Sequence, residues 1–346
     1  MKRFLISPEK KQYRANLHCH SVLSDGHLTP VELRDLYKAH GYEILAITDH
    51  ERPHCHQDLC EPDFLMITGY EGYLRPDPLC RWNMYAPEVH LNLFARDPMN
   101  TTMICFNEAF CKYAARDHAL DEIAPRAGSE RTREYTLEYI NEYIRTAREN
   151  GYLVAYNHPY WSMDLEEKIE AYEGIFSLEI CNYGSWQANG LEYCGSLYDR
   201  LLRKGHRVFC HAADDNHNEH PVDDPENDSF GAYTMILAEE LTYDAVFHAM
   251  ETGEMYASMG PRFHEVSIER NRVHVECSPV KHIYVHNGGK KPGHLHARPG
   301  EFLTSADFVI PHDADYIRAS IMDGEGLRAD TRGFFREEIG FPPQKD

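Results

Sequence analysis

Short apolar runs alternate with amphipathic, helix-like segments over the first 260 residues of the chain. The apolar runs are rich in Val, Ile, Leu and aromatic residues and end at turn-forming residues, which is typical of strands. The predicted strands are residues 13–20, 43–50, 64–71, 88–95, 151–159, 175–182 and 206–215. Strands that alternate with helices in this way predict an α/β fold built on a parallel sheet or barrel.

The segments between these strands carry helix signals. Thr29 is suited to be an N-cap, Pro30 occupies the first helical position and Gly41 is a stop signal, so residues 29–41 are predicted to be helical. Helical periodicity also covers residues 131–150 and 191–205. The stretch 97–133 fits no repeat, and we interpret it as an insertion that carries a helix and could act as a lid.

The pattern changes after Pro261. Apolar and polar residues alternate along residues 263–289, and Asn271-Arg272 and Asn287-Gly288 are turn signals, so this part is predicted to be antiparallel. We therefore expect a barrel domain over residues 1–260 and a small C-terminal antiparallel β unit over residues 261–346.

Composition excludes several classes of partner. The 346 residues include 35 Lys and Arg against 56 Asp and Glu, a formal net charge of −21, which argues against binding long nucleic acids or anionic membranes. The ten cysteines include no CxxC pair, and several lie in apolar runs as in a reduced compartment. With no signal-like or membrane-spanning apolar stretch in the sequence, we expect a cytoplasmic protein.

The 22 histidines are the most informative feature of the composition, and two of them stand in the stretch NLHCHSVLSDG. His18 and His20 are two residues apart, so in an extended chain both imidazoles point to the same side while Cys19 points away. Two neutral imidazoles directed at one point suit a metal ion. One such pair could equally be a pair of surface or capping histidines. The residues at the other predicted strands are therefore needed to distinguish a metal site from structural histidines.

Imidazoles and carboxylates recur where other predicted strands end. The residues in question are His18, His20, Asp25, His50, Glu71, His90, His158, Asp215 and His217. In a parallel barrel, the carboxyl ends of the strands meet at one mouth, where active sites form. Each residue alone has a structural explanation, but their coincidence at six strands predicts a metal centre.

The ordered set HCH with DG, ITDH, GYE, EVHL, NHP and DNH resembles the signature of the polymerase-and-histidinol-phosphatase (PHP) superfamily. The stretch from Phe230 to Pro261, which ends in ASMGP, is similar to the carbaryl-hydrolase-like branch of that superfamily. This resemblance implies a distorted (β/α)7 TIM-like barrel that binds up to three divalent metal ions.

The resemblance also implies a ligand set for each metal. His18, His20, Glu71 and Asp215 would hold the first metal, and Glu71 would bridge to a second metal held by His90 and His158. Asp25, His50 and His217 would hold a third. Asp214 stays an alternative to Asp215 if the turn is shifted by one residue.

A mixed histidine and carboxylate ligand set suits zinc, iron or manganese. We expect two or three such ions and the hydrolysis of a small-molecule or nucleotide phosphate ester by metal-activated hydroxide, with Glu71, Asp25 and His217 as catalytic residues. The same centre could instead hydrolyse a carbamate, amide or other non-phosphate ester. A third alternative is a metal-binding module without turnover.

Other residues have weaker claims to a functional role. The loop 50–60 could form a separate zinc site or could lie beside the mouth, where His54 or Arg52 would meet substrate. An arginine after Glu71 could clamp a phosphate or pair with surface carboxylates. A tryptophan could stack on a substrate ring or pack in the core. The residues considered are Arg52, His54, Cys55, His56, Cys60, Arg75, Arg81, Trp161, Trp186, His211 and His220.

Overall fold

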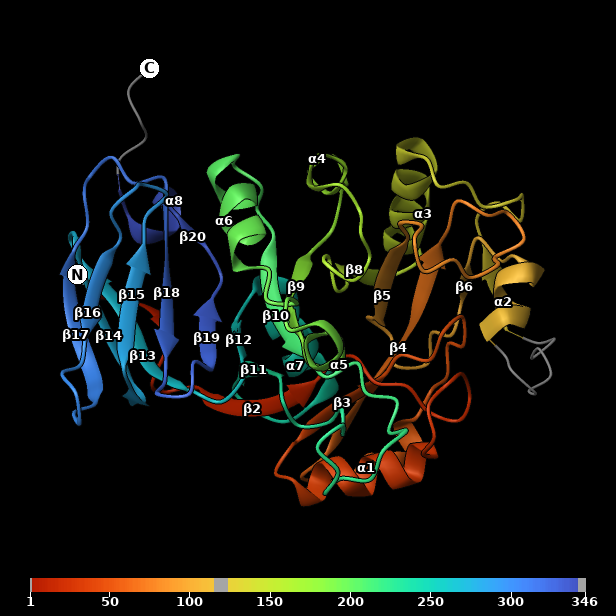
Figure 1. Ribbon diagram of the computed structural model, residues 1–346, viewed down its shortest axis with the longest axis horizontal. Helices are drawn as coiled ribbons and strands as arrows, with labels where there is room; N and C mark the ends of the chain where they lie inside the picture. Colours follow the sequence, from red (N-terminus) through yellow and green to blue (C-terminus); the bar gives the residue numbers. More distant parts are fainter. Residues whose placement is uncertain (1, 115–123, 342–346) are drawn as a thin grey trace.

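A computed structural model describes residues 2–114 and 124–341 as a strand-rich α/β fold (Figure 1). The largest sheet follows one path of hydrogen-bonded strands. In spatial order they are β10 (Phe209–Ala213), β9 (Ser177–Asn182), β8 (Tyr152–Tyr156), β5 (Val89–Ala95), β4 (Leu65–Leu74), β3 (Ile44–Ile47), β2 (Lys11–Asn16), β11 (Tyr233–Ala238), β12 (Met255–Ser258), β19 (Arg328–Thr331), β18 (Tyr316–Met322), β15 (His282–His286) and β16 (Gly293–His296), with β20 (Phe334–Phe335) paired to β18. All seven predicted strands are present in this path.

The helices are short. They are α1 (Pro30–Ala39), α2 (Glu108–Ala114), α3 (Leu137–Glu149), α4 (Glu166–Ile169), α5 (Tyr183–Asn189), α6 (Gly195–Arg203), α7 (Tyr243–Thr252) and α8 (Arg336–Ile339), with a 3₁₀ turn η1 (Gln57–Leu59). Helices α1, α3, α5 and α7 each begin at a Thr or Asn side chain that caps them. Thr29 and Glu32 form the capping box of α1. Helix α3 begins after Thr136, which caps it, so it is shorter than the predicted 131–150. No helix among the described residues is long and apolar enough to cross a membrane.

The expectation of an all-parallel barrel is wrong at β5. Strands β2, β3 and β4 pair in parallel, and so do β8, β9 and β10, but β5 runs antiparallel to both β4 and β8. The connection between β4 and β5 contains no helix, so the chain returns directly beside the strand it has left. Among the described residues, pairing between the named strands does not close this path into a barrel. The segments that follow β2 and β10 do meet, at a parallel bridge between Cys19 and Asn216, where the Asn216 carbonyl oxygen accepts from the His20 amide at 3.0 Å.

A smaller antiparallel sheet lies at the left of Figure 1. Its order is β1 (Lys2–Ile6), β13 (Phe263–Glu269), β14 (Arg272–Val280) and β17 (Leu303–Val309). The first strand of the chain therefore pairs with β13, beyond the predicted boundary at residue 260. Strand β12 also pairs with β19 across this boundary. The division of the chain into two domains at residue 260 stays a prediction.

The stretch 97–133 contains β6 (Met103–Ile104), α2 and β7 (Arg126–Ala127), and part of it lies outside the described residues. Its last residue, Arg133, is fully buried and donates to Glu51 Oε2 at 2.8 Å and to the Tyr73 carbonyl oxygen at 2.8 Å. Glu51 directly follows His50, so this buried ion pair joins the stretch to the end of β3. The helix expected there is present, while a lid function stays a prediction.

Candidate metal centre

The two histidines that follow β2 point to one side of the chain, as their spacing predicts. Both are fully buried, and their Nε2 atoms lie 3.0 Å (His18) and 2.9 Å (His20) from Asp215 Oδ1. Cys19 between them is also buried, and it belongs to an apolar cluster together with Leu33 and Tyr37 of α1. The extended backbone thus separates a packing residue from two possible ligands.

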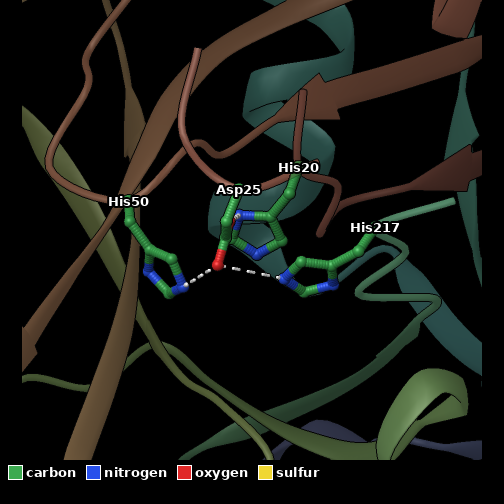
Figure 2. Close-up of side chains that lie close together, drawn as sticks. All are labelled: His20, Asp25, His50 and His217. Atoms are coloured by element: carbon green, nitrogen blue, oxygen red, sulfur yellow. Dashed lines mark ion pairs between the residues drawn. The ribbon is translucent and has the colours of Figure 1, made fainter. Parts of the chain in front are cut away.

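A tight loop brings Asp25 back to His20 (Figure 2). The Asp49 carboxylate fixes this loop, because it accepts hydrogen bonds from the Ser21 amide at 2.7 Å and the Ser24 hydroxyl at 2.7 Å. Only glycine fits at position 26, where a β-carbon would lie 2.2 Å from the His20 carbonyl oxygen.

Asp25 stands between two further imidazoles in Figure 2. Its Oδ2 lies 3.6 Å from His50 Nε2 and 3.5 Å from His217 Nε2, and its Oδ1 lies 3.5 Å from His20 Nδ1. The His20 ring stacks on His217 with centroids 4.4 Å apart. These four side chains come from three separate segments of the chain and converge on one point.

Glu71 is the central carboxylate of the site and is fully buried in β4. One of its oxygens lies 3.3 Å from His18 Nε2 and 3.4 Å from His158 Nε2, and the other lies 2.9 Å from His50 Nδ1. His90 Nδ1 contacts the first oxygen at 3.1 Å. Because its two oxygens face different imidazoles, Glu71 is placed to bridge two cations.

His90 reaches the centre from the beginning of its strand rather than from the end. Because β5 runs antiparallel to its neighbours, its N-terminal residues lie at the same edge of the sheet as the carboxyl ends of β4 and β8. His90 therefore lies at the edge of the sheet that the sequence predicted, although its strand runs in the opposite direction.

Asp214 and Asp215 have opposite surroundings. The Asp214 carboxylate is buried away from the histidines and accepts hydrogen bonds from the Tyr37 hydroxyl and from the amides of Phe230, Gly231 and Ala232. Burial raises the pKa of Asp214 to about 7 despite these bonds. Asp215 has a left-handed backbone, with φ of 53°, and places its carboxylate against His18 and His20. The geometry favours Asp215 as the ligand.

All nine residues predicted from the sequence come together, in four overlapping groups whose possible ligand atoms lie within 4.8 Å of one another. The groups are His20, Asp25, His50 and His217; His18, His158 and Asp215; His18, His20 and Glu71; and His50, Glu71 and His90. The grouping differs in one respect from the expected ligand sets, because His20 also faces Asp25, His50 and His217. It thus joins the expected first and third sites.

Several buried atoms of this centre have no hydrogen-bond partner among the described residues. They are Nε2 of His18, His20 and His90, Nδ1 of His50, Oε2 of Glu71 and Oδ1 of Asp215. Buried polar atoms are nearly always satisfied. His90 Nε2 faces Glu88, but the other five atoms face one another, and such a group of lone-pair donors fits divalent cations that would coordinate them. Histidine and carboxylate donors together are the set expected for zinc, iron or manganese.

The electrostatics of the centre also favour cations. Burial opposes protonation of His90, but Glu71 and Glu88 outweigh it and raise the pKa of His90 to about 9. Burial likewise opposes protonation of His217, and Asp25 outweighs it, so the pKa of His217 rises to about 10. The negative potential that holds protons on these imidazoles would also attract metal ions, which compete with protons for the same nitrogens.

Two carboxylates behind the centre were not identified from the sequence. Glu179, fully buried in β9, contacts His18 Nδ1 at 3.1 Å through Oε1 and accepts from the His158 amide at 2.9 Å through Oε2. Glu88 lies 3.3 Å from His90 Nε2 and is paired with Arg75. Carboxylates in this position fix the tautomer and orientation of ligating histidines. A glutamate inside the apolar run SLEICN was the available signal for Glu179.

The centre opens into a cavity of about 810 Å³. Among the weaker candidates, Arg75, Trp161 and His220 line this cavity. Trp186 lines a separate cavity near Arg318, and Arg81 is an exposed residue paired with Asp77. His211 is buried behind the site, where it bonds Ser177, and burial lowers its pKa to about 4.

The separate zinc site considered for the loop 50–60 is not formed. No group of three possible metal ligands among the described residues includes His54, Cys55, His56 or Cys60. The His54 and His56 rings lie 5.9 Å apart, and the Cys55 thiol contacts the Met99 sulfur.

Comparison with known proteins gives structural likenesses only. No family model matches the chain, and no curated protein matches its sequence. A two-domain protein from Bacteroides vulgatus that contains a predicted PHP-like metal-dependent phosphoesterase is similar in structure, with 14% identity, coverage of 94% of this chain and 96% of that one, and a TM-score of 0.45.

Two further structures are similar over part of this chain. A candidate metal-dependent phosphoesterase from Bifidobacterium adolescentis is 16% identical over 62% of this chain and 91% of its own, with a TM-score of 0.39. An amidohydrolase from Chromobacterium violaceum with bound sulfate and no metal is 15% identical over 70% of this chain and 96% of its own, also with a TM-score of 0.39. Likenesses this distant transfer no residue role, activity or substrate to this chain.

Proposed function

We propose that this protein is a metal-dependent phosphoesterase of the PHP superfamily, of the carbaryl-hydrolase-like branch, built on a distorted (β/α)7 barrel. Its substrate would be a small-molecule or nucleotide phosphate ester, and it would act in the cytoplasm. The observation that carries the proposal is the cluster of six imidazoles and three carboxylates at the floor of an 810 Å³ cavity, with buried donor atoms left without hydrogen bonds.

The proposed ligands are the nine residues already predicted, shared among two or three zinc, iron or manganese ions. Such ions, when bound, acidify water to a nucleophile and neutralise phosphoryl oxygens. Glu71 would hold two adjacent positions at a fixed separation, because its oxygens face His18 and His50 on opposite sides. Glu179 and Glu88 would keep His18 and His90 oriented.

Asp25 and His217 have the most open position of the nine, since both line the cavity and are partly exposed. With two ions bound and the third position empty, they would be placed to take the proton of the attacking water and to pass a proton to the departing alcohol oxygen. The overall reaction converts a phosphate monoester and water into an alcohol and inorganic phosphate, with no covalent bond to the protein.

A carbonyl hydrolase is the second candidate, and one observation keeps it open. Among the described residues lining the cavity, Arg75 is the one Lys or Arg side chain, and its guanidinium is bonded to Glu88. A cavity with so little positive charge outside the metal centre also accommodates a neutral carbamate, amide or ester.

The test is phosphate release by protein purified without chelator, measured together with bound metal per chain. Metal-dependent release from phosphomonoesters, lost on chelation and restored by metal, is the expected result. Release of alcohol from carbamates or carboxylic esters without release of phosphate would replace the phosphoesterase by the carbonyl hydrolase. Bound metal with neither activity would favour the third alternative, a metal-binding module without turnover.

A further inference from the structure

A second cavity of about 650 Å³ adjoins the metal cavity. Two side chains, Trp82 and Trp161, line both of them. The Trp161 ring lies edge-on to two imidazoles of the centre, 5.2 Å from His90 and 4.8 Å from His158 between ring centroids. The two cavities thus meet at the side of the centre formed by these histidines.

Large apolar side chains are exposed around this second cavity. Met84, Tyr160, Met163 and Leu191 line it, and Leu191 is 56% exposed. Apolar side chains that gather at one exposed place mark a binding site more often than isolated ones do. Their continuity with the metal cavity indicates what they bind, because a molecule held at the metal centre could extend directly onto them.

The charges of the second cavity are already paired. Its three acidic side chains are bonded within the protein: Asp164 accepts from the Tyr135 hydroxyl at 2.6 Å, Glu166 is bonded to Arg200, and Glu88 is bonded to Arg75. No Lys or Arg lines this cavity among the described residues. A second phosphate or a carboxylate placed there would lose its hydration without gaining a cation.

The segment that carries Trp161 is held in place. The buried Glu192 carboxylate accepts hydrogen bonds from the Tyr160 amide at 3.0 Å and from the Trp161 amide at 2.7 Å. A ring on a fixed backbone offers a preformed surface, so little ordering is needed when a flat group packs against it.

We propose that this second cavity binds the leaving group of the substrate, and that the leaving group is an uncharged alcohol with an apolar ring. This inference rests on the proposed function and narrows it. It disfavours nucleotide bisphosphates and sugar phosphates, whose leaving groups are anionic or strongly hydrated.

The experiment compares 2-phenylethyl phosphate with ethyl phosphate on the metal-loaded protein. The two leaving alcohols have closely similar intrinsic reactivity, so any difference in kcat/KM reports binding of the ring. Burial of one aromatic ring predicts a preference of roughly 10- to 100-fold for the phenylethyl ester. Equal kcat/KM for the two esters would overturn the inference.

A matched pair of variants locates the effect. Leu191→Ser removes an apolar side chain from the cavity and is expected to reduce the preference about threefold to tenfold. Leu165→Ser changes a leucine that is 68% exposed on a nearby segment but does not line the cavity, and it should keep the preference of the parent protein. An equal loss in both variants would contradict this placement of the ring.

Unreactive phosphonates separate this inference from the proposed function. Calorimetry of the metal-loaded protein with 2-phenylethylphosphonate and ethylphosphonate measures binding without turnover. Tighter binding of the phenylethyl compound without hydrolysis of either ester would support binding of the ring in the second cavity and contradict the proposed phosphoesterase activity. Hydrolysis of both esters with equal binding of both phosphonates would support the proposed phosphoesterase activity and overturn the inference that the second cavity binds an apolar ring.

Discussion

Two buried polar clusters of this protein differ in how fully they are satisfied. Arg318, in the C-terminal part of the large sheet, donates to the two oxygens of Asp199 at 2.8 and 2.7 Å, and it also bonds Ser320 and Asp330. None of these four side chains has a buried atom without a hydrogen bond among the described residues. In the candidate metal centre, by contrast, six buried atoms have no hydrogen-bond partner among the described residues.

The difference lies in whether each cluster is complete without a ligand. The Arg318 cluster joins α6 to β18 and β19, and its single guanidinium is bonded to both carboxylates, so its buried polar atoms have partners without a ligand. The metal centre is buried to a similar degree but accumulates imidazole nitrogens and carboxylate oxygens that face one another. Incomplete satisfaction at such a depth is destabilising unless cations bind there.

The largest effect is expected from removal of a ligand. His20→Ala should reduce phosphate release on the order of 1000-fold, because it deletes a donor shared by two groups of the centre. Metal analysis of the same preparation should show fewer bound ions per chain. His274→Ala, which alters an exposed histidine of the small sheet, is the control and should change neither quantity.

Removal of the central cation of the other cluster should affect stability instead. Arg318→Met leaves the buried Asp330 and the partly buried Asp199 without a cation and is expected to lower the free energy of unfolding by about 3–5 kcal/mol, as measured by denaturant titration. Its bound metal per chain should stay at the parent value. Loss of metal in this variant would show that the two clusters are not independent.

The Arg318 cluster should also respond to acid. Burial opposes ionisation of Asp199, but the hydrogen bonds and charge of Arg318 outweigh it and lower its pKa. A depressed folded-state pKa gives stability that is present above the unfolded value of about 3.9 and is lost as the pH falls through the folded value. Denaturation titrations below pH 4 should therefore show a smaller acid loss in Asp199→Asn than in the parent protein.

A smaller effect is expected from the carboxylate behind His18. Glu179→Gln keeps the shape of the side chain but weakens its hold on His18 Nδ1, and metal affinity should fall about 10- to 100-fold. Competition with a chromophoric chelator measures this affinity without reference to turnover. Asp330→Asn, a buried carboxylate of the other cluster, is the matched control, and an equal fall there would refute the positioning role.

The smallest expected effect is the change of metal affinity with pH. The pKa of His90 is raised to about 9 in the metal-free protein, so metal has to displace a proton from it at neutral pH. Affinity should increase as the pH rises from 6.5 to 9, and proton release measured in weakly buffered solution should accompany binding. A metal affinity independent of pH over this range would contradict the expectation that metal displaces a proton from His90.

Local signals were enough to predict seven strands of the large sheet and the nine residues that lie together in the centre. Residues such as His18 and His20 owe their common direction to two-residue spacing alone. The antiparallel course of β5, the pairing of Lys2–Ile6 with β13 and the contact of Glu179 with His18 depend on which distant segments meet. Tertiary packing decides those contacts, and no periodicity in one sequence reports them.

The central claim is that the nine residues bind metal, and X-ray anomalous scattering tests it most directly. Crystals of protein purified without chelator should give two or three anomalous peaks at the zinc, iron or manganese edges, located between Glu71, Asp215 and the six histidines. Absence of any peak there, even after reconstitution with all three metals, would contradict the account.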